Sequence, residues 1–357
     1  MRIAVVMSGG RGKRFWPLSR KKRPKQLIRI LNGKTLLELT LERLAPLFDA
    51  SNTLIVTQQQ QVPLTRQIAG GLGEVTILAE PVGRNTAPCI AFAASYVRAA
   101  HGDGVLALVP ADHFIGDVEA FRRVMAAGLD FVERTGTLLT IGIRPDRPAT
   151  GFGYIEVGDE VGSVEGHDFF KVKAFREKPS QETAISYLES GRHLWNAGIF
   201  VFKASAIMEE IGRHLPAMAE EFERCAGRFG TPDEAESLAR CYAAVEDISI
   251  DYGVMEKTDK ACVVPADIGW DDVGNWESFS KYMERDPLGN AVRGTHVTVD
   301  SRDCVVYSEK AVVATAGLEG IAVIATDDAI LIVRKEKSEQ VKDLVNKIEN
   351  NGLFEIL

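Results

Sequence analysis

A glycine-rich segment near the amino terminus has the residue types that bind a phosphate group. It follows an apolar run and consists of Ser8, Gly9, Gly10, Arg11, Gly12, Lys13 and Arg14. Glycine lets the backbone approach a ligand closely, so that successive N–H groups can point at a phosphate oxygen. Arg14 could add a bidentate, charge-assisted hydrogen bond. The dinucleotide-binding fingerprint does not fit, because its last glycine would fall at Phe15.

This segment begins a basic island in a protein that is acidic overall. Residues 11–29 contain nine arginines and lysines and no acid, whereas the whole chain has a formal net charge of −8. The overall charge argues against binding nucleic acid through global electrostatics. The island indicates a local polyanion site, although a solvated surface loop is an equally good interpretation of residues 20–23.

The segments that would position the glycine-rich loop alternate between strands and helices. Continuous apolar runs, typical of strands buried on both faces, lie at 2–7, 53–57, 75–79, 105–109 and 137–143. Helical spacing lies between them, at 35–47 and 88–100. This order predicts an α/β fold with a Rossmann-like, mostly parallel mixed sheet flanked by helices. Because ligands bind at the carboxyl ends of such strands, we expect chemistry just after Met7, Ala79 and Val109.

The pattern changes further along the chain. The stretch 151–204 has shorter β-like segments and many glycines, which indicates an inserted or antiparallel section. Helical spacing returns at 205–215 and 233–244. After 286, short β segments alternate with turn-rich pieces. We therefore predict a large domain at 1–285 and a small β-rich domain at 286–357.

A final helix is predicted at about 338–350, with Ser338 as its N-cap. Its apolar stripe consists of Val341, Leu344, Val345 and Ile348. Such a stripe could form a homodimer interface, or it could equally pack inside the chain.

The composition is that of a globular protein in a reducing, cytoplasmic environment. No apolar run approaches the ~18–20 residues of a transmembrane helix, and we interpret the start MRIAVVMSGG as a core strand rather than a signal peptide. The five cysteines form no Cys-x-x-Cys pair and the six histidines form no His-Glu-x-x-His motif. We therefore expect free thiols, no zinc site and no membrane partner.

An ordered set of motifs resembles the sugar-nucleotide pyrophosphorylase family. These motifs are Gly9-Gly10-x-Gly12-x-Arg14 with Pro24-Lys25-Gln26, Glu80-Pro-x-Gly-Arg-Asn-Thr-Ala-Pro88, Pro110-Ala-Asp-His113, Glu177-Lys-Pro179, Trp195-Asn-Ala-Gly-Ile-Phe200 and Trp270-Asp-Asp-Val-Gly-Asn-Trp276. The RNTAP and WDDVG forms resemble, within that family, the mannose-1-phosphate guanylyltransferases. The resemblance covers residues 1–285, which would be the nucleotidyltransferase catalytic domain.

The resemblance implies transfer of GMP from GTP to mannose 1-phosphate, which gives GDP-mannose and pyrophosphate. The sugar phosphate would attack the α-phosphate in line. A phosphate monoester is already an anion near neutral pH, because its second pKa is near ~6, so no dedicated base is required. No Ser/His/Asp triad is evident in the sequence. Catalysis should therefore rest on positioning and on neutralisation of charge.

The resemblance also implies roles for individual residues. Arg14 and Lys25 would be the catalytic cations that contact the β- and γ-phosphates. Asp112 and Asp272 would be catalytic carboxylates that share one Mg²⁺, or another divalent cation, with the phosphates and water. Asp271 ranks lower, because the metal ligand in the family is the second residue after the tryptophan.

The predicted nucleotide-binding residues are Ser8, Gly9, Gly10, Gly12, Lys13, Glu80, Arg84, Asn85 and Thr86. Guanine presents two hydrogen-bond donors, N1–H and an exocyclic amine, so we expect the carboxylate of Glu80 to contribute to base selection. Asn85 or Thr86 could also simply cap the next helix, with Pro88 in its first turn.

The resemblance implies that the sugar 1-phosphate site consists of Gly153, Tyr154, Glu177, Lys178, Asn196, Gly198 and Asp251. A carboxylate and an amide suit vicinal hydroxyls, a lysine suits the phosphate, and glycines allow close backbone contact. Asp251 is the weaker candidate, since a role in a helix or turn is an equally good interpretation. Trp195 and Phe200 are expected in the core.

Three other functions stay open on the sequence. The first is a pyrophosphorylase for another pair of NTP and sugar 1-phosphate. The second is a silent relative that binds a sugar nucleotide and regulates a partner, although all four catalytic residues are present. The third is nucleic-acid binding through 11–29, which predicts salt-sensitive affinity and leaves the glycines and aspartates unexplained. The roughly 70 residues after the catalytic region are too few for a fused isomerase, so we predict a single activity.

Overall fold

The computed structural model describes residues 1–31 and 33–357, and these divide into two compact units. The first unit consists of Met1–Gly9, Thr40–Ala111 and Ile115–Trp270. The second unit consists of Gly10–Leu39, Asp112–Phe114 and Asp271–Leu357. The part of the glycine-rich loop from Gly10 onward is thus grouped with the C-terminal region. The predicted limits at 1–285 and 286–357 do not coincide with this grouping, and as domain limits they stay a prediction.

A mixed sheet forms the centre of the first unit. Within the described residues it has nine strands in the order β5-β4-β1-β6-β11-β8-β12-β10-β9. These strands are β1 (Arg2–Met7), β4 (Thr53–Gln58), β5 (Thr76–Glu80), β6 (Val105–Pro110), β8 (Leu138–Ile143), β9 (Gly153–Val164), β10 (His167–Glu177), β11 (His193–Lys203) and β12 (Ala261–Ala266). The run from β5 to β6 is parallel, whereas β11 is antiparallel to both β6 and β8.

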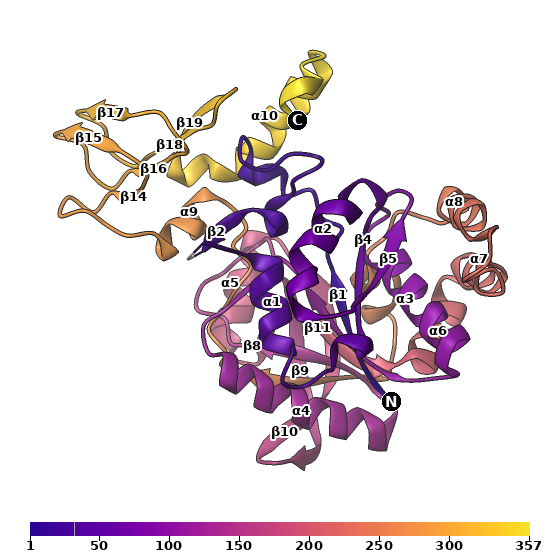
Figure 1. The fold of residues 1–357 in the computed structure, drawn as a ribbon. Helices are drawn as coiled ribbons and strands as arrows, with labels where there is room; N and C mark the ends of the chain where they lie inside the picture. Colours follow the sequence, from indigo (N-terminus) through magenta and orange to yellow (C-terminus); the bar gives the residue numbers. More distant parts are fainter. Residues whose placement is uncertain (32) are drawn as a thin grey trace. The chain divides into compact units, whose positions relative to one another are not determined.

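Helices cover both faces of this sheet (Figure 1). They are α2 (Val62–Ala69), α3 (Thr86–His101), α4 (Val118–Thr135), α5 (Gln181–Ser190), α6 (Ala204–His214), α7 (Pro216–Ala226) and α8 (Glu234–Ala244). α3, α6 and α7 pack together and share a hydrophobic core with Ile3 and Val5 of β1. α4 covers the other face, where a side chain at its Gly128 would meet Leu139 and Val201. Because both faces are covered, the four inner residues of β1 are all apolar and buried.

The α/β class predicted from the sequence is confirmed. The five predicted strands correspond to β1, β4, β5, β6 and β8. The stretch 151–204 contains β9, β10 and β11, and each of them pairs antiparallel with its neighbours. The expected antiparallel section is therefore part of the same sheet.

The second unit contains a coil of short strands. They are β14 (Ala291–Arg293), β15 (His296–Val299), β16 (Val305–Ser308), β17 (Val313–Ala316), β18 (Ile321–Ala325) and β19 (Ile330–Arg334). β14, β16 and β18 stack in parallel in one sheet, and β15 pairs in parallel with β17 in another. Successive strands therefore alternate between two sheets, which is the winding of a parallel β-helix. The predicted β appendage is confirmed.

Shorter elements complete the chain. The remaining strands and helices are β2 (Arg29–Leu31), β3 (Lys34–Thr35), α1 (Leu36–Leu44), β7 (Phe114–Ile115), β13 (Trp270–Asp271), α9 (Trp276–Phe279) and α10 (Val341–Asn350). The 3₁₀ helices are η1 (Lys13–Phe15), η2 (Lys25–Leu27), η3 (Ala50–Asn52), η4 (Gln59–Gln61), η5 (Gly70–Leu72), η7 (Ser280–Tyr282), η8 (Lys335–Gln340) and η9 (Phe354–Ile356), and η6 (Asp251–Met255) is a π-helix turn.

The start of the terminal helix differs from the prediction. The α-helix begins at Val341, and Ser338 lies inside the preceding 3₁₀ helix. The Ser338 hydroxyl donates back to the carbonyl oxygen of Lys335 at 2.6 Å, so it does not cap a forward N–H. The predicted N-cap at Ser338 is therefore wrong. The apolar stripe mostly serves packing within this unit, since Val341 and Val345 are buried in its core.

The core of the second unit also fixes the glycine-rich loop. Phe15, Trp16 and Leu18 are buried together with Trp276 of α9 and apolar residues of the β-helix. The rings of Phe15 and Trp276 lie 5.1 Å apart, and the Trp276 indole N–H donates to the Trp16 carbonyl oxygen at 3.2 Å. Since aromatic burial contributes several kcal/mol, roughly 3–5 per deleted ring, the backbone around Arg14 is well anchored.

Candidate active site

A cavity of about 360 Å³ lies in the second unit. Its lining consists of Arg11, Gly12, Lys13, Arg14, Phe15, Lys25, Asp112, His113, Asp272, Gly274 and Lys342. All four residues predicted to be catalytic therefore line one space, although they come from three separate segments of the chain. Cationic side chains outnumber carboxylates five to two among the described lining residues, which suits a polyanionic ligand.

Lys25 is the most buried cation of this cavity, with a side chain that is only 5% exposed. Its ammonium lies 2.9 Å from Asp112 Oδ2 and donates to the main-chain oxygens of Asp272 and Val273 at 2.9 and 3.2 Å. A buried ammonium requires such partners, because an uncompensated charge would be costly. Lys25 thus contacts both chain segments that carry the aspartates of the cavity, at Asp112 and at Asp272.

Gly12 allows this arrangement. Its φ of +60° lies in the left-handed region, and a Cβ there would stand 2.6 Å from the Cβ of Lys25. The Gly12 carbonyl oxygen accepts from the Ser19 hydroxyl at 2.7 Å. Only glycine therefore lets the loop pass this close to Lys25.

The other loop cations contact the C-terminal helices of the same unit. Arg14 Nε lies 2.7 Å from a carboxylate oxygen of Glu339. Lys13 Nζ donates to Asn346 Oδ1 at 2.8 Å. Gly10, a further predicted nucleotide-binding residue, accepts from Gln26 Nε2 at 3.1 Å through its carbonyl oxygen. These contacts orient the loop around the cavity.

The two aspartates of the cavity differ in their pKa. Enclosure by the protein would raise the pKa of Asp112, but the Lys25 ammonium and His113 hold it below the ordinary value. Burial raises the pKa of Asp272, and the carboxylates of Asp271 and Asp112 add to this rise against the opposing effect of Lys25. Two carboxylates that repel each other across a cavity would both be stabilised by a cation between them.

Asp271 is engaged in structural contacts instead. Its Oδ1 accepts from the Val273 backbone N–H at 2.7 Å, and its Oδ2 lies 3.1 Å from Lys281 Nζ. The lower rank of Asp271 as a metal ligand thus has a physical reason, because it has these partners and, unlike Asp112 and Asp272, does not line the cavity. It also serves as a natural comparison for Asp272.

The remaining nucleotide candidates belong to the first unit. Ser8 continues β1 and donates its N–H to the Val56 carbonyl oxygen at 2.8 Å. Gly9 accepts from Gln58 Nε2 at 2.7 Å, and a Cβ at Gly9 would stand 2.9 Å from Glu80 Oε2. The glycine therefore leaves room for the Glu80 carboxylate at the end of β5.

Glu80 is held by Tyr242, a residue that the sequence reasoning did not single out. The Tyr242 hydroxyl donates to Glu80 Oε1 at 3.1 Å, and both side chains are buried. Burial raises the pKa of Glu80 to about 7, which the hydrogen bond from Tyr242 only partly offsets. The main-chain oxygen of Tyr242 accepts from Arg84 Nε at 3.2 Å. One tyrosine thus positions two of the predicted nucleotide-binding residues.

Replacing Glu80 by glutamine should remove a pH-dependent cost of folding. The folded carboxyl has a pKa of about 7 against an ordinary value of 4.5, so the unfolded chain loses this proton first as the pH rises. As the pH rises from 4.5 to about 7, the free energy of unfolding therefore falls by up to roughly 1.4 kcal/mol per pH unit. Urea unfolding at pH 5 and pH 8 should show Glu80→Gln gaining stability relative to wild type at the higher pH. If the free energies of unfolding of variant and wild type differed equally at pH 5 and pH 8, the raised pKa of a buried Glu80 carboxyl would be contradicted.

The loop after Glu80 is joined to a later segment. Asn85 is the N-cap of α3, since its side chain accepts from the Thr86 N–H at 3.0 Å. The Thr86 hydroxyl oxygen accepts from the Ile250 N–H at 2.9 Å. Of the two caps that the sequence allowed, Asn85 is the one observed. Thr86 instead ties this loop to the residue before Asp251.

Most candidates for the sugar phosphate lie together in the first unit. Asn196 Nδ2 donates to Asp251 Oδ1 at 3.0 Å, and Asn196 Oδ1 accepts from the Gly198 N–H at 3.0 Å. A Cβ at Gly153 would stand 2.4 Å from Glu177 Oε2 and 3.3 Å from the Cβ of Asn196. These residues therefore form one polar cluster, which includes the weaker candidate Asp251.

This polar cluster contains three carboxyl groups and one lysine, at Glu177, Asp251, Glu256 and Lys178. Lys178 Nζ lies 2.9 Å from Glu177 Oε1, and the Glu177 N–H donates to Glu256 Oε1 at 2.9 Å. Burial, together with the Glu177 carboxylate, raises the pKa of Asp251 to about 7. Tyr154 differs from the others, because its side chain is buried and its ring packs 5.3 Å from that of Tyr187.

Comparison with known proteins identifies the family. The model described as nucleotidyl transferase matches residues 3–287. The chain belongs to the nucleotidyl transferase family. A second model, described as the MannoseP isomerase/GMP-like beta-helix domain, matches residues 294–348, in agreement with the coil from β15 to β19. Family membership confirms the predicted enzyme class.

Individual relatives carry more specific names. Mannose-1-phosphate guanylyltransferase ManC of Salmonella typhimurium is 37% identical over 361 residues, which are 98% of this chain and 74% of that protein. A structure described as mannose-1-phosphate geranyltransferase from Thermus thermophilus is 39% identical with a TM-score of 0.86, over 98% of this chain and 99% of that chain. A mannose-6-phosphate isomerase from Helicobacter pylori is 29% identical with a TM-score of 0.61, over 76% of this chain and 100% of that chain.

The cavity of this nucleotidyl transferase has donors that suit a divalent cation. Asp112 and Asp272 offer carboxylate oxygens, which are the ligands that Mg²⁺ prefers. Across residues 1–31 and 33–357, no group of three or more His, Cys, Asp or Glu side chains is placed to hold a metal ion. Two carboxylates suffice where phosphates and water complete the coordination, as is usual for Mg²⁺.

In the described part of the chain, no helix is long and apolar enough to cross a bilayer.

Proposed function

We propose that the chain transfers GMP from GTP to mannose 1-phosphate and releases GDP-mannose and pyrophosphate. The observation that supports this most is the cavity lined by Arg14, Lys25, Asp112 and Asp272. Membership of the nucleotidyl transferase family supports the reaction type, and the relatives named mannose-1-phosphate guanylyltransferase support this pair of substrates.

The proposed mechanism relies on position and charge. The sugar phosphate is an anion at neutral pH and needs no base to attack the α-phosphate. Arg14 and Lys25 would bind the β- and γ-phosphates and stabilise the negative charge of the departing pyrophosphate. Asp112 and Asp272 would hold Mg²⁺, which supplies further positive charge to the phosphates. The fixed contacts of Lys25 support this role, because a preorganised cation loses little energy to reorientation.

Selection of the two substrates is assigned to the first unit. The carboxylate of Glu80 would accept from the guanine N1–H and amine. Asn196, Asp251 and Glu177 would bind sugar hydroxyls, and Lys178 would bind the sugar phosphate. The polar cluster around Asn196 supports this assignment, because carboxylate and amide oxygens close together suit vicinal hydroxyls.

The test is a pyrophosphate-release assay across a grid of NTPs and sugar 1-phosphates, with and without Mg²⁺. We expect the pair GTP and mannose 1-phosphate to give the highest kcat/KM and to require the cation. A higher value for another pair would favour a different pyrophosphorylase. No release from any pair would overturn the proposal and favour a sugar-nucleotide-binding regulator.

Tyr242→Phe should weaken guanine selection while catalysis persists. The substitution removes the hydroxyl that orients Glu80 but keeps the buried ring. One lost hydrogen bond to a carboxylate corresponds to a fall of about tenfold in kcat/KM for GTP, and Glu80→Gln should lower it at least as much. The ratio of kcat/KM for GTP to that for ATP measures the effect. Tyr96→Phe, another tyrosine of the first unit, is the control, and an equal ratio in all variants would remove Tyr242 and Glu80 from base selection.

Further properties stay predictions. The sequence reasoning predicts a cytoplasmic location and no nucleic-acid partners, and it leaves open whether the chain forms a homodimer. Light scattering on the purified chain measures the oligomeric state, and titration with DNA or RNA at two salt concentrations measures nucleic-acid binding.

A further inference from the structure

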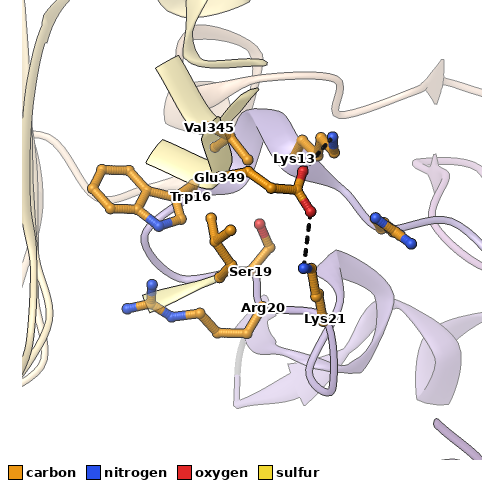
Figure 2. Close-up of a pocket in the computed structure, with 9 residues that line it drawn as sticks. Lys13, Trp16, Ser19, Arg20, Lys21, Val345 and Glu349 are labelled. Carbon is orange, nitrogen blue, oxygen red and sulfur yellow. Dashed lines mark hydrogen bonds and ion pairs between the residues drawn. The ribbon is translucent and has the colours of Figure 1, made fainter. Parts of the chain in front are cut away.

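One polar face of α10 contacts the basic loop. Asn346 accepts from Lys13 at 2.8 Å, and Glu349 lies 2.9 Å from Lys21 Nζ, as Figure 2 shows for the Glu349 pair. The loop is further held by the end of the chain, because the Trp16 indole N–H donates to the Ile356 carbonyl oxygen at 2.7 Å. The terminal helix therefore holds the loop that contains Arg14.

Lys342 lies on this same face. The positions 342, 346 and 349 are four and three residues apart, a spacing that places side chains on one side of a helix. Lys342 lines the cavity that also contains Arg14, Lys25, Asp112 and Asp272. The terminal helix thus contributes a cation to the site as well as contacts to the loop.

The cations of the cavity differ in whether they have protein partners. Lys13, Arg14 and Lys25 are engaged with Asn346, Glu339 and Asp112. Within residues 1–31 and 33–357, the Lys342 side chain makes no hydrogen bond or ion pair. An ammonium that faces a cavity without a counter-ion is available for a ligand, and it adds to a local excess of positive charge that favours a polyphosphate.

We propose that Lys342 is a polyphosphate-binding residue of the reaction, which contacts the β- and γ-phosphates of the NTP and the pyrophosphate product. This rests on the proposed function, since the substrate is taken to be a nucleoside triphosphate. Lys342 acts in binding rather than in the chemical step. The terminal helix after the β-helix is therefore part of the active site, and the loop and the helix together enclose the phosphate chain.

The experiment compares Lys342→Gln with Lys347→Gln in the full chain. Lys347 is an exposed lysine of the same helix that does not line the cavity, so it is a matched control for the loss of one charge. Lys342→Gln should raise KM for GTP, and for pyrophosphate in the reverse direction, by about tenfold, which is about 1.4 kcal/mol. Its kcat and its KM for mannose 1-phosphate should stay at the wild-type values. Lys347→Gln should match the wild type in all of these constants.

A binding measurement separates this proposal from the assignment of substrates. Inorganic tripolyphosphate is titrated into each protein calorimetrically, at low and at raised salt. Weaker binding by Lys342→Gln alone supports the polyphosphate role even if the wild type releases no pyrophosphate from GTP. Equal tripolyphosphate affinities and equal KM values for the two variants, with unchanged melting temperatures, would overturn it, whatever the wild-type activity.

Discussion

Lys25→Gln is expected to lower kcat/KM for pyrophosphate release by about 10³-fold. The ammonium lies 2.9 Å from Asp112 Oδ2 and donates to the Asp272 carbonyl oxygen at 2.9 Å. Glutamine would remove the charge that neutralises the leaving phosphate and would leave Asp112 without its counter-charge. Steady-state rates with GTP and mannose 1-phosphate measure the loss.

Lys22→Gln is the matched control for Lys25→Gln. Lys22 is an exposed residue of the same basic segment and does not line the cavity, so its loss should leave kcat/KM at the wild-type value. Circular dichroism separates a catalytic loss from unfolding, and Lys25→Arg, which keeps the charge, should retain part of the activity. A folded Lys25→Gln protein with wild-type kcat/KM would exclude Lys25 from the catalytic residues.

Asp272→Asn is expected to lower kcat by about 10²-fold or more and to raise the Mg²⁺ concentration that gives half of the maximal rate. The Asp272 carboxylate lines the cavity together with Asp112. Loss of one of the two anionic ligands should weaken the binding of a divalent cation by several kcal/mol, where roughly 1.4 kcal/mol corresponds to a factor of ten. The measurement is the rate of pyrophosphate release as a function of Mg²⁺ concentration.

The neighbouring Asp271→Asn provides the control for Asp272→Asn. Asparagine keeps an oxygen for the Val273 N–H, so this variant should fold and should show the wild-type Mg²⁺ dependence. If both variants shifted the Mg²⁺ dependence equally, or if neither did, Asp272 would not be the specific ligand that we propose.

The sheet was predictable because burial on both faces leaves a clear pattern. β1, β4 and β6 each contain an uninterrupted run of apolar residues, and strands of this kind in alternation with helices belong to few folds. The catalytic residues of the cavity were predictable for another reason. Lys25, Asp112 and Asp272 lie at fixed places in ordered motifs, so their common cavity could be expected before any contact was known.

Long-range contacts left no such pattern. Tyr242 is 162 residues from Glu80, and nothing near either residue indicates that they meet. The grouping of the loop with the C-terminal region depends on Phe15, whose partner Trp276 is even more remote in the sequence. The start of α10 was mistaken because a serine hydroxyl can bond backward as well as cap forward, and the sequence does not distinguish the two.

The most direct test is a crystal structure with Mg²⁺ and a GTP analogue whose α- and β-phosphates are joined by a methylene group. We predict that the β- and γ-phosphates contact Arg14 and Lys25 and that the metal ion contacts both Asp112 and Asp272. A triphosphate bound elsewhere, with these four side chains free of it, would contradict the proposed active site.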